Sequence, residues 1–246
     1  VGHDGSQGGV WAVTTDTPDE AQPEWSAPRR LTDGVMMCKP LVLSSGEWVL
    51  PASTWRKTDH SARMVVSTDQ GKTWEVRGAA HVPEKMRNYD EHMIVERPDG
   101  TLWMLVRIAG GGIGESLSQD RGKTWTEVRR GNIPHVVSRF FINRLASGNL
   151  LLVKHADDAR SRSHLTAYLS KDEGKSWQGG LMLDERATVS YPDGVQAEDG
   201  QIYCIYYRNR RSDKQILIAT FTAQDVEKGQ PTSDRCRLQE LVDQAK

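Results

Sequence analysis

Four side chains in this sequence have types suited to binding an anion and attacking a carbon centre: Glu91, Arg107, Arg162 and Tyr191. Arg107 closes a short apolar run, and Tyr191 opens the run Tyr-Pro-Asp-Gly. Two arginines can hold a carboxylate through paired hydrogen bonds, which lysines cannot reproduce. A tyrosine has an ordinary pKa of about 10, so it needs a neighbouring base before it can act as a nucleophile.

Each of these residues also has an ordinary structural interpretation. Taken alone, Glu91 fits a solvated carboxylate at a strand edge, Arg107 a surface cation, and Tyr191 a side chain packed at a strand start. Arg160 lies close to Arg162 and competes for the same assignment. The functional interpretation therefore requires a fold that brings residues far apart in the chain to one central mouth.

The elements that could do this are indicated by a repeat. The pattern S-x-D-x-G-K-[TS]-W occurs at residues 67–74, 118–125 and 170–177, and its aspartates are 51 and 52 residues apart. In each copy the aspartate can accept main-chain N–H bonds within a turn, and the glycine supplies an unusual φ. We therefore predict a structural role, and not a catalytic one, for Asp69, Asp120 and Asp172.

A second landmark keeps the same spacing. Gly46, Gly100, Gly148 and Gly200 each follow Ser or Asp between short apolar runs, with intervals of 54, 48 and 52 residues. Such pairs are typical of tight hairpins between strands. Each repeat of about 50 residues thus holds four short strands, which is the content of one β-propeller blade.

The three S-x-D-x-G-x-[TS]-W copies resemble the Asp-box, or BNR repeat, of the sialidase (neuraminidase) superfamily. The resemblance covers about residues 8–225 and is greatest to bacterial BNR-repeat exo-sialidase-like proteins, whose fold is a six-bladed propeller. We expect an all-β chain in which residues 1–225 form a partial propeller lacking one or two N-terminal blades. Residues 226–246 are expected to be a polar tail, with a short helix over 238–245.

This resemblance implies roles for the four residues. Residues 90–100 resemble a family strand pair, which places Glu91 as the base that activates the nucleophile and Arg107 as the second carboxylate-binding arginine. Arg162 matches the third such arginine, and Tyr191 matches the nucleophile. A neutral phenol approaches an anionic sugar without the repulsion that a carboxylate would meet. Sialidases are known as the tyrosine exception among glycosidases with two carboxylates.

The sequence also departs from the family pattern. No R-I-P-type motif supplies the first arginine, and the acid/base aspartate has only Asp4 and Asp59 as weak candidates. Tyr207 stands where many sialidases carry a glutamate, and Pro192 replaces a small polar residue after the nucleophile. Either missing sequence supplies these groups, or the site has changed its function.

The remaining polar residues point to no metal or cofactor. Cys38, Cys204 and Cys236 have no metal-ligand spacing. His92 and His155 could line the pocket. The cluster at residues 208–211, Arg-Asn-Arg-Arg, favours a solvated loop over a ligand site. The histidines considered are scattered along the chain: His60, His92, His135, His155 and His164.

The composition limits the classes of partner that the protein is expected to bind. The 246 residues carry a formal charge of −1, which argues against a general nucleic-acid binder. No run approaches the roughly 18 apolar residues that a membrane span needs. No leader segment precedes the first predicted strand, so a signal peptide is expected to be absent or removed. A periplasmic or secreted location is favoured only by analogy with other glycan-degrading propellers.

The sequence therefore predicts a retaining, sialidase-like exo-glycosidase that releases sialic acid or a related acidic sugar from glycans, without a cofactor. Two alternatives remain open. One is a propeller glycosidase or polysaccharide lyase acting on another acidic or deoxy sugar, with His92 or His155 in its acid/base set. The other is a non-catalytic glycan-binding propeller, in which the incomplete set of residues is the real state of the protein.

Overall fold

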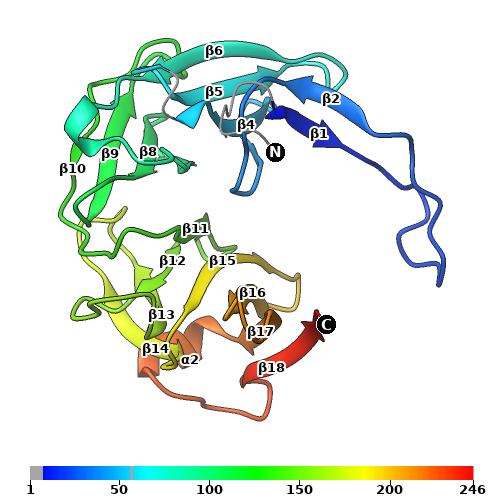
Figure 1. The fold of residues 1–246 in the computed structure, drawn as a ribbon, viewed down its shortest axis with the longest axis vertical. Coiled ribbons are helices and arrows are strands. Elements are labelled where there is room, and N and C mark those ends of the chain that lie inside the picture. The colour runs from blue at the N-terminus through cyan, green and yellow to red at the C-terminus, as the bar shows by residue number, and fades with distance from the viewer. Residues whose placement is uncertain (1–7, 56–57, 246) are drawn as a thin grey trace. The chain divides into compact units, whose positions relative to one another are not determined.

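A computed structural model describes residues 8–55 and 58–245 and shows an all-β chain (Figure 1). A two-stranded sheet, β1 (Val10–Ala12) with β2 (Arg29–Thr32), comes first. Four sheets of four strands follow within the described residues. Their strands are β3 (Leu41–Val42), β4 (Trp48–Ser53), β5 (Ala62–Ser67), β6 (Glu75–Ala80), β7 (His92–Glu96), β8 (Leu102–Arg107), β9 (Ile113–Ser118), β10 (Arg129–Arg130), β11 (Phe141–Arg144), β12 (Leu150–His155), β13 (Leu165–Ser170), β14 (Gln178–Asp184), β15 (Val189–Gln196), β16 (Ile202–Arg208), β17 (Gln215–Phe221) and β18 (Arg237–Gln244). The short helices described are η2 (Glu84–Met86) and α2 (Ala223–Lys228).

Each four-stranded sheet follows the order of the chain, as a propeller blade does. The predicted hairpin glycines lie between the first and second strands of the sheets, where Gly148 has a φ of +85°. The third strands β5, β9 and β13 end on the serines of the repeated motif. The predicted all-β fold, built of four-stranded blades, is confirmed.

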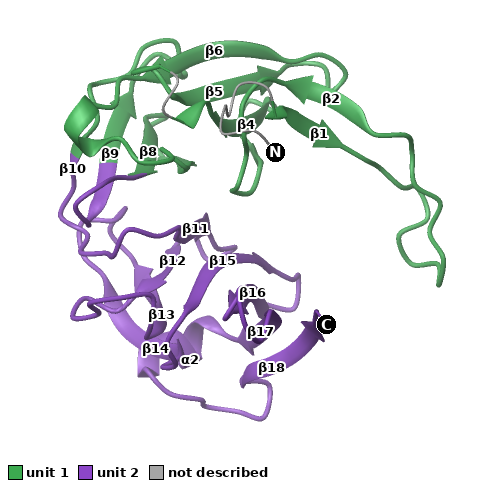
Figure 2. Cartoon of the chain, viewed as in Figure 1, with its two compact units in different colours: residues 1–106, 115–129 green, residues 107–114, 130–246 purple. Residues whose placement is uncertain are grey.

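The chain divides into two compact units, drawn in green and purple in Figure 2. Unit 1 comprises residues 1–106 and 115–129, and unit 2 comprises residues 107–114 and 130–246. In unit 2, all six residues of β12 are buried, and this strand lies between β11 and β13. Burial of leucine side chains along such a central strand stabilises the sheet by roughly 1.5–3 kcal/mol per side chain.

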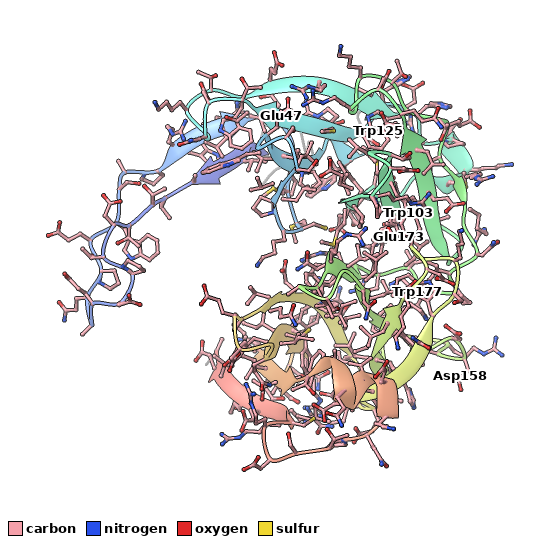
Figure 3. The ribbon with its side chains drawn as sticks, turned by 180° about the vertical axis from the view of Figure 1, so that it is seen from behind. Glu47, Trp103, Trp125, Asp158, Glu173 and Trp177 are labelled. Atoms are coloured by element: carbon pink, nitrogen blue, oxygen red, sulfur yellow. The ribbon has the colours of Figure 1, made fainter. Side chains whose placement is uncertain are left out.

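The repeated motif is a turn closed by its own side chains. In the third copy, Asp172 accepts hydrogen bonds from the main-chain nitrogen of Ser176 at 2.9 Å and from its hydroxyl at 2.5 Å. Ser170 donates to the same carboxylate at 2.8 Å and accepts from the nitrogen of Gly174 at 2.8 Å. Trp177, labelled in Figure 3, closes the motif and is half-buried. These contacts give the aspartate the structural role that the sequence predicts.

These bonds make one part of the protein's stability depend on pH. The Ser176 hydroxyl and main-chain N–H lower the pKa of Asp172 to about 2. A carboxylate whose pKa is lowered by folding contributes stability above its unfolded pKa of about 3.9, and this contribution is lost as the pH falls toward 2. We expect Asp172→Asn to be less stable than wild type at pH 7 and to lose less stability between pH 4 and 2. Urea midpoints measured across this range test the expectation, with exposed Asp158→Asn as the control. The same change of urea midpoint with pH in wild type and in Asp172→Asn would contradict the expectation.

The C-terminal segment corrects a prediction. Residues 237–244 form the strand β18, and the helix predicted over 238–245 is wrong. Strand β17 presents an open edge, and β18 pairs with it, for example Leu217 with Leu241. Main-chain hydrogen bonds along this edge outweigh a local helical preference in a short segment. The helix nearest the C-terminus is instead α2, which is closed by Thr222 and Asp225 in a capping box and by Gly229 in the left-handed conformation.

Helix α2 packs closely on β14. Gly179 of β14 has a φ of +78°, and a Cβ atom at this position would collide with the carbonyl oxygen of Val226. We expect Gly179→Ala to lower the free energy of unfolding by about 3 kcal/mol, combining left-handed strain with overpacking. Gly148→Ala is the matched control because its φ is +85° and its Cβ would meet open space. It should lose only the strain, about 1–2 kcal/mol. Urea unfolding measures both variants. Equal losses of unfolding free energy in Gly179→Ala and Gly148→Ala would show that α2 does not restrict the residues allowed in β14.

Candidate active site

A β-bulge in unit 2 sets the position of Tyr191. The pairing of β15 with β16 joins Ser190 to Tyr207 and Asp193 to Ile205, so an extra residue is inserted in β15. Tyr191 has a φ of +61°, which is unusual for a residue other than glycine. A buried hydrogen bond between the hydroxyls of Ser138 and Ser190 fixes the residue before it. Bulges of this kind redirect one side chain out of the regular alternation.

Two of the predicted arginines contact Tyr191. The Nη1 of Arg107, at the end of β8, donates to the phenol oxygen of Tyr191 at 3.3 Å. The guanidinium of Arg162, on the loop between β12 and β13, lies 5.5 Å from the centre of the Tyr191 ring. Arg107 is only 4% exposed. Residues separated by 84 positions in the sequence are thus in hydrogen-bond contact.

Tyr207 completes the contacts of Arg162. The Nη1 of Arg162 donates to the Tyr207 hydroxyl at 3.0 Å, and its Nη2 donates to the carbonyl of Val137 at 3.3 Å. The rings of Tyr207 and Tyr191 meet edge to face, with centres 5.3 Å apart. Both acceptors of Arg162 are uncharged, so they orient this guanidinium without neutralising it.

A third arginine at Tyr191 was missed by the sequence analysis. The guanidinium of Arg139 lies 5.3 Å from the centre of the Tyr191 ring, and its Nη2 lies 3.4 Å from a carboxylate oxygen of Asp193. Its side chain is buried. The Nε of Arg139 is also buried and has no hydrogen-bond partner in the described part of the chain.

A signal for Arg139 exists in the repeat. Glu91, Arg139 and Tyr191 each stand nine residues before a hairpin glycine, and so occupy equivalent positions at the start of successive sheets. The partner position, seven residues after the same glycine, holds Arg107, His155 and Tyr207. These positions lie at the open end of the first hairpin in each sheet, opposite its glycine turn. Aligning the repeats on the glycine would have selected Arg139.

His155 forms a neutral pair with His135 in unit 2. The rings stack with centres 5.4 Å apart, and the Nδ1 of His155 lies 2.8 Å from the carbonyl of Ser163. Burial lowers the pKa of His155 to about 4 and that of His135 well below its ordinary value. The Nε2 of His155 is buried without a hydrogen-bond partner among the described residues. His155 thus remains neutral at physiological pH.

Glu91 and His92 belong to unit 1. Glu91 is 5% exposed and follows Asp90, which accepts a 2.5 Å hydrogen bond from Ser61. The ring nitrogens of His92 lie 3.0 Å from the carbonyl of Asp90 and 2.9 Å from that of Arg63. Burial lowers the pKa of His92. The polar atoms of His92 are engaged with the main chain, so we do not include it in the proposed site.

The candidates for the acid/base aspartate remain weak. Asp4 lies outside the described residues. Asp59 is half-exposed, and its carboxylate lies 3.0 Å from a ring nitrogen of His60 and 3.6 Å from His81. The hydrogen bond to His60 lowers the pKa of Asp59, which opposes the role of general acid.

The described residues include no group of three or more His, Cys, Asp and Glu side chains placed to hold a metal ion. They also include no helix of the length and apolar character required to cross a bilayer.

Four-stranded blades, three of which carry an Asp-box turn between their third and fourth strands, define a β-propeller of the sialidase type. The leech intramolecular trans-sialidase has this fold with a TM-score of 0.65 at 17% identity, over 85% of this chain and 36% of that one. The intramolecular trans-sialidase of Ruminococcus gnavus gives a TM-score of 0.63 at 19% identity, over 85% of this chain and 50% of that one.

Sequence comparison supports the same class. The family model of the BNR repeat-like domain matches residues 4–204, and the chain belongs to this family. A protein of Bacteroides fragilis (strain YCH46) named sialidase is 28% identical over 189 residues. That match covers 68% of this chain and 34% of the relative, so the chain spans about a third of the length of that protein. The six-blade count and the missing N-terminal blades stay predictions.

Proposed function

We propose that this protein is a sialidase-type glycoside hydrolase acting on a terminal acidic sugar. The observation that carries the proposal is the meeting of Arg107 and Arg162 at Tyr191 in unit 2. Guanidinium groups beside a phenol suit a substrate whose reacting carbon bears a carboxylate, because the arginines hold the anion while an uncharged nucleophile approaches. Family membership supports the same reaction class.

In the proposed reaction, Arg107 and Arg162 bind the sugar carboxylate and Tyr191 attacks the anomeric carbon. The phenol oxygen forms a bond to that carbon and gives up its proton to water, the glycosidic bond breaks, and the leaving oxygen takes a proton from water. Water then hydrolyses the glycosyl-tyrosine, which gives net retention. Glu91, the base that the family resemblance implies, belongs to unit 1, and no step of the proposed reaction in unit 2 is assigned to it.

The groups around Tyr191 favour the tyrosine as the nucleophile and the arginines as the groups that bind the sugar carboxylate. Arg139 and Arg162 lie over the ring, and Arg107 donates to its oxygen. Positive charge close to the phenol stabilises a developing phenolate and also attracts an anionic substrate. Tyr207 takes the place of an acidic residue here and holds Arg162 while leaving its charge available to the sugar.

The test is release of sialic acid from aryl sialosides and sialyllactose by wild type and by Arg107→Gln. We expect turnover by wild type and a loss of about 100-fold or more in kcat/KM for Arg107→Gln, because the neutral amide cannot form charge-assisted paired hydrogen bonds to the sugar carboxylate. Release from another acidic or deoxy sugar alone would support the alternative glycosidase or lyase. Glycan binding without turnover would support the non-catalytic propeller.

A further inference from the structure

A pocket of about 290 Å³ lies beside Tyr207 in unit 2, under the loop between β16 and β17. Three arginines line it: Arg162, Arg210 and Arg211. The guanidinium of Arg210 is 5.7 Å from the Tyr207 ring centre and 6.0 Å from that of Tyr191. The pocket is therefore continuous with the residues assigned to the acidic sugar, and it extends beyond them toward Arg211.

The charge of this pocket is not balanced by acidic groups. Its lining contains no aspartate or glutamate, and its other polar groups include Thr188, Asn209 and Ser212. Neither Arg210 nor Arg211 has a carboxylate within ion-pair distance among residues 8–55 and 58–245. Exposed arginines that lack an acidic neighbour and converge on a concavity favour an anionic ligand.

Hydrogen bonds that do not involve Arg210 or Arg211 fix the conformation of the loop between β16 and β17. Arg208 donates to Asp213 at 2.8 Å, and Asn209 donates to the same carboxylate oxygen at 2.8 Å. These bonds, led by that from Asn209, lower the pKa of Asp213. Asn209 also accepts from the Thr188 hydroxyl, which ties the loop to the segment before β15. Asp213 thus neutralises Arg208, while Arg210 and Arg211 stay available.

Resting on the proposed function, we infer that this pocket binds a second oxyanion of the substrate, carried by the sugar next to the one that Tyr191 attacks. The substrate class is then a doubly acidic glycan, in which a sulfate ester or a uronate carboxylate neighbours the terminal acidic sugar. Guanidinium groups pair with either oxyanion through parallel N–H···O bonds. The sequence favoured a solvated loop at residues 208–211, because the residues that this loop contacts in the folded protein could not be known from sequence.

Binding is tested first with sulfate and with methyl glucuronide, by titration of the arginine Nε–Hε signals in nitrogen–proton NMR spectra of the full protein. We expect saturable shifts at Arg210 and Arg211, weakening with added salt. The Arg210→Gln/Arg211→Gln variant should bind about tenfold less tightly. Arg160→Gln, which removes an exposed arginine outside the pocket, should bind as wild type does. The tighter of the two probes identifies the oxyanion. No saturable shift with either probe, or an unchanged affinity in the double variant, would overturn the inference.

Specificity is tested second, with sialyllactose and its counterpart sulfated on the adjacent galactose. We expect kcat/KM to favour the sulfated substrate by about tenfold, and Arg211→Gln to abolish this preference while hydrolysing the plain substrate at the wild-type rate. An equal preference in Arg211→Gln and wild type would contradict the inference. If neither substrate is cleaved, the proposed function fails, and the titration still decides whether the pocket binds an oxyanion.

Discussion

Replacing Tyr191 with phenylalanine is expected to lower kcat by about 1,000-fold or more, because the variant lacks the oxygen that would bond to the anomeric carbon. The ring should keep its place, since its contacts with Arg139, Arg162 and Tyr207 involve the aromatic face and edge. KM or inhibitor affinity should therefore change little. Steady-state kinetics on an aryl sialoside, with calorimetric binding of the free acidic sugar, measure both quantities.

The matched control is Tyr203→Phe, because Tyr203 lies on the neighbouring strand β16 and is 40% exposed. It should retain the wild-type kcat. Full activity in Tyr191→Phe would remove the nucleophile from the proposal. Equal losses of activity and of binding would indicate that the hydroxyl organises Arg107 and takes no part in bond formation.

Arg162→Lys is expected to reduce kcat/KM by about 100-fold. The guanidinium of Arg162 donates to Tyr207 and to the carbonyl of Val137 with separate nitrogens and lies 5.5 Å from the centre of the Tyr191 ring. An ammonium group keeps the charge but cannot keep this arrangement and still offer paired donors to a carboxylate. Because the interaction acts on the bound sugar, the loss should appear chiefly in KM.

Arg160→Lys distinguishes the two arginines that the sequence left in competition. Arg160 is exposed on the same loop, so its substitution should change kcat/KM less than twofold. Kinetics of both variants on one substrate make the comparison. A larger loss in Arg160→Lys than in Arg162→Lys would reverse the assignment.

The architecture was predictable because it repeats. A hairpin glycine recurs in all four sheets and an Asp-box turn in the first three, and each imposes a local geometry that does not depend on distant residues. The strands between them follow from short apolar runs, as in β12, whose six residues are all buried. The last strand was not predictable in this way. The segment 237–244 forms β18 only because β17 leaves an edge to pair with, and that edge belongs to the tertiary fold.

The site was predictable in part, for the same physical reason. Arg107, Arg162 and Tyr191 were selected by their place relative to hairpins and boxes, and unit 2 brings them together. Arg139 was missed because only the alignment of the repeats reveals that it shares the position of Tyr191. The bulge that rotates Tyr191 out of the regular alternation has no signature in the residue types alone.

The assignment of Tyr191 at the centre of this constellation is tested most directly by trapping the covalent adduct. A fluorinated sialosyl fluoride, in which the ring fluorine slows hydrolysis of the adduct, is incubated with the protein, and the digested peptides are weighed by mass spectrometry. We predict one added glycosyl group on the peptide that contains Tyr191, and none in Tyr191→Phe. A glycosyl group on a different side chain, or rapid turnover of the reagent with Tyr191→Phe, would contradict the account.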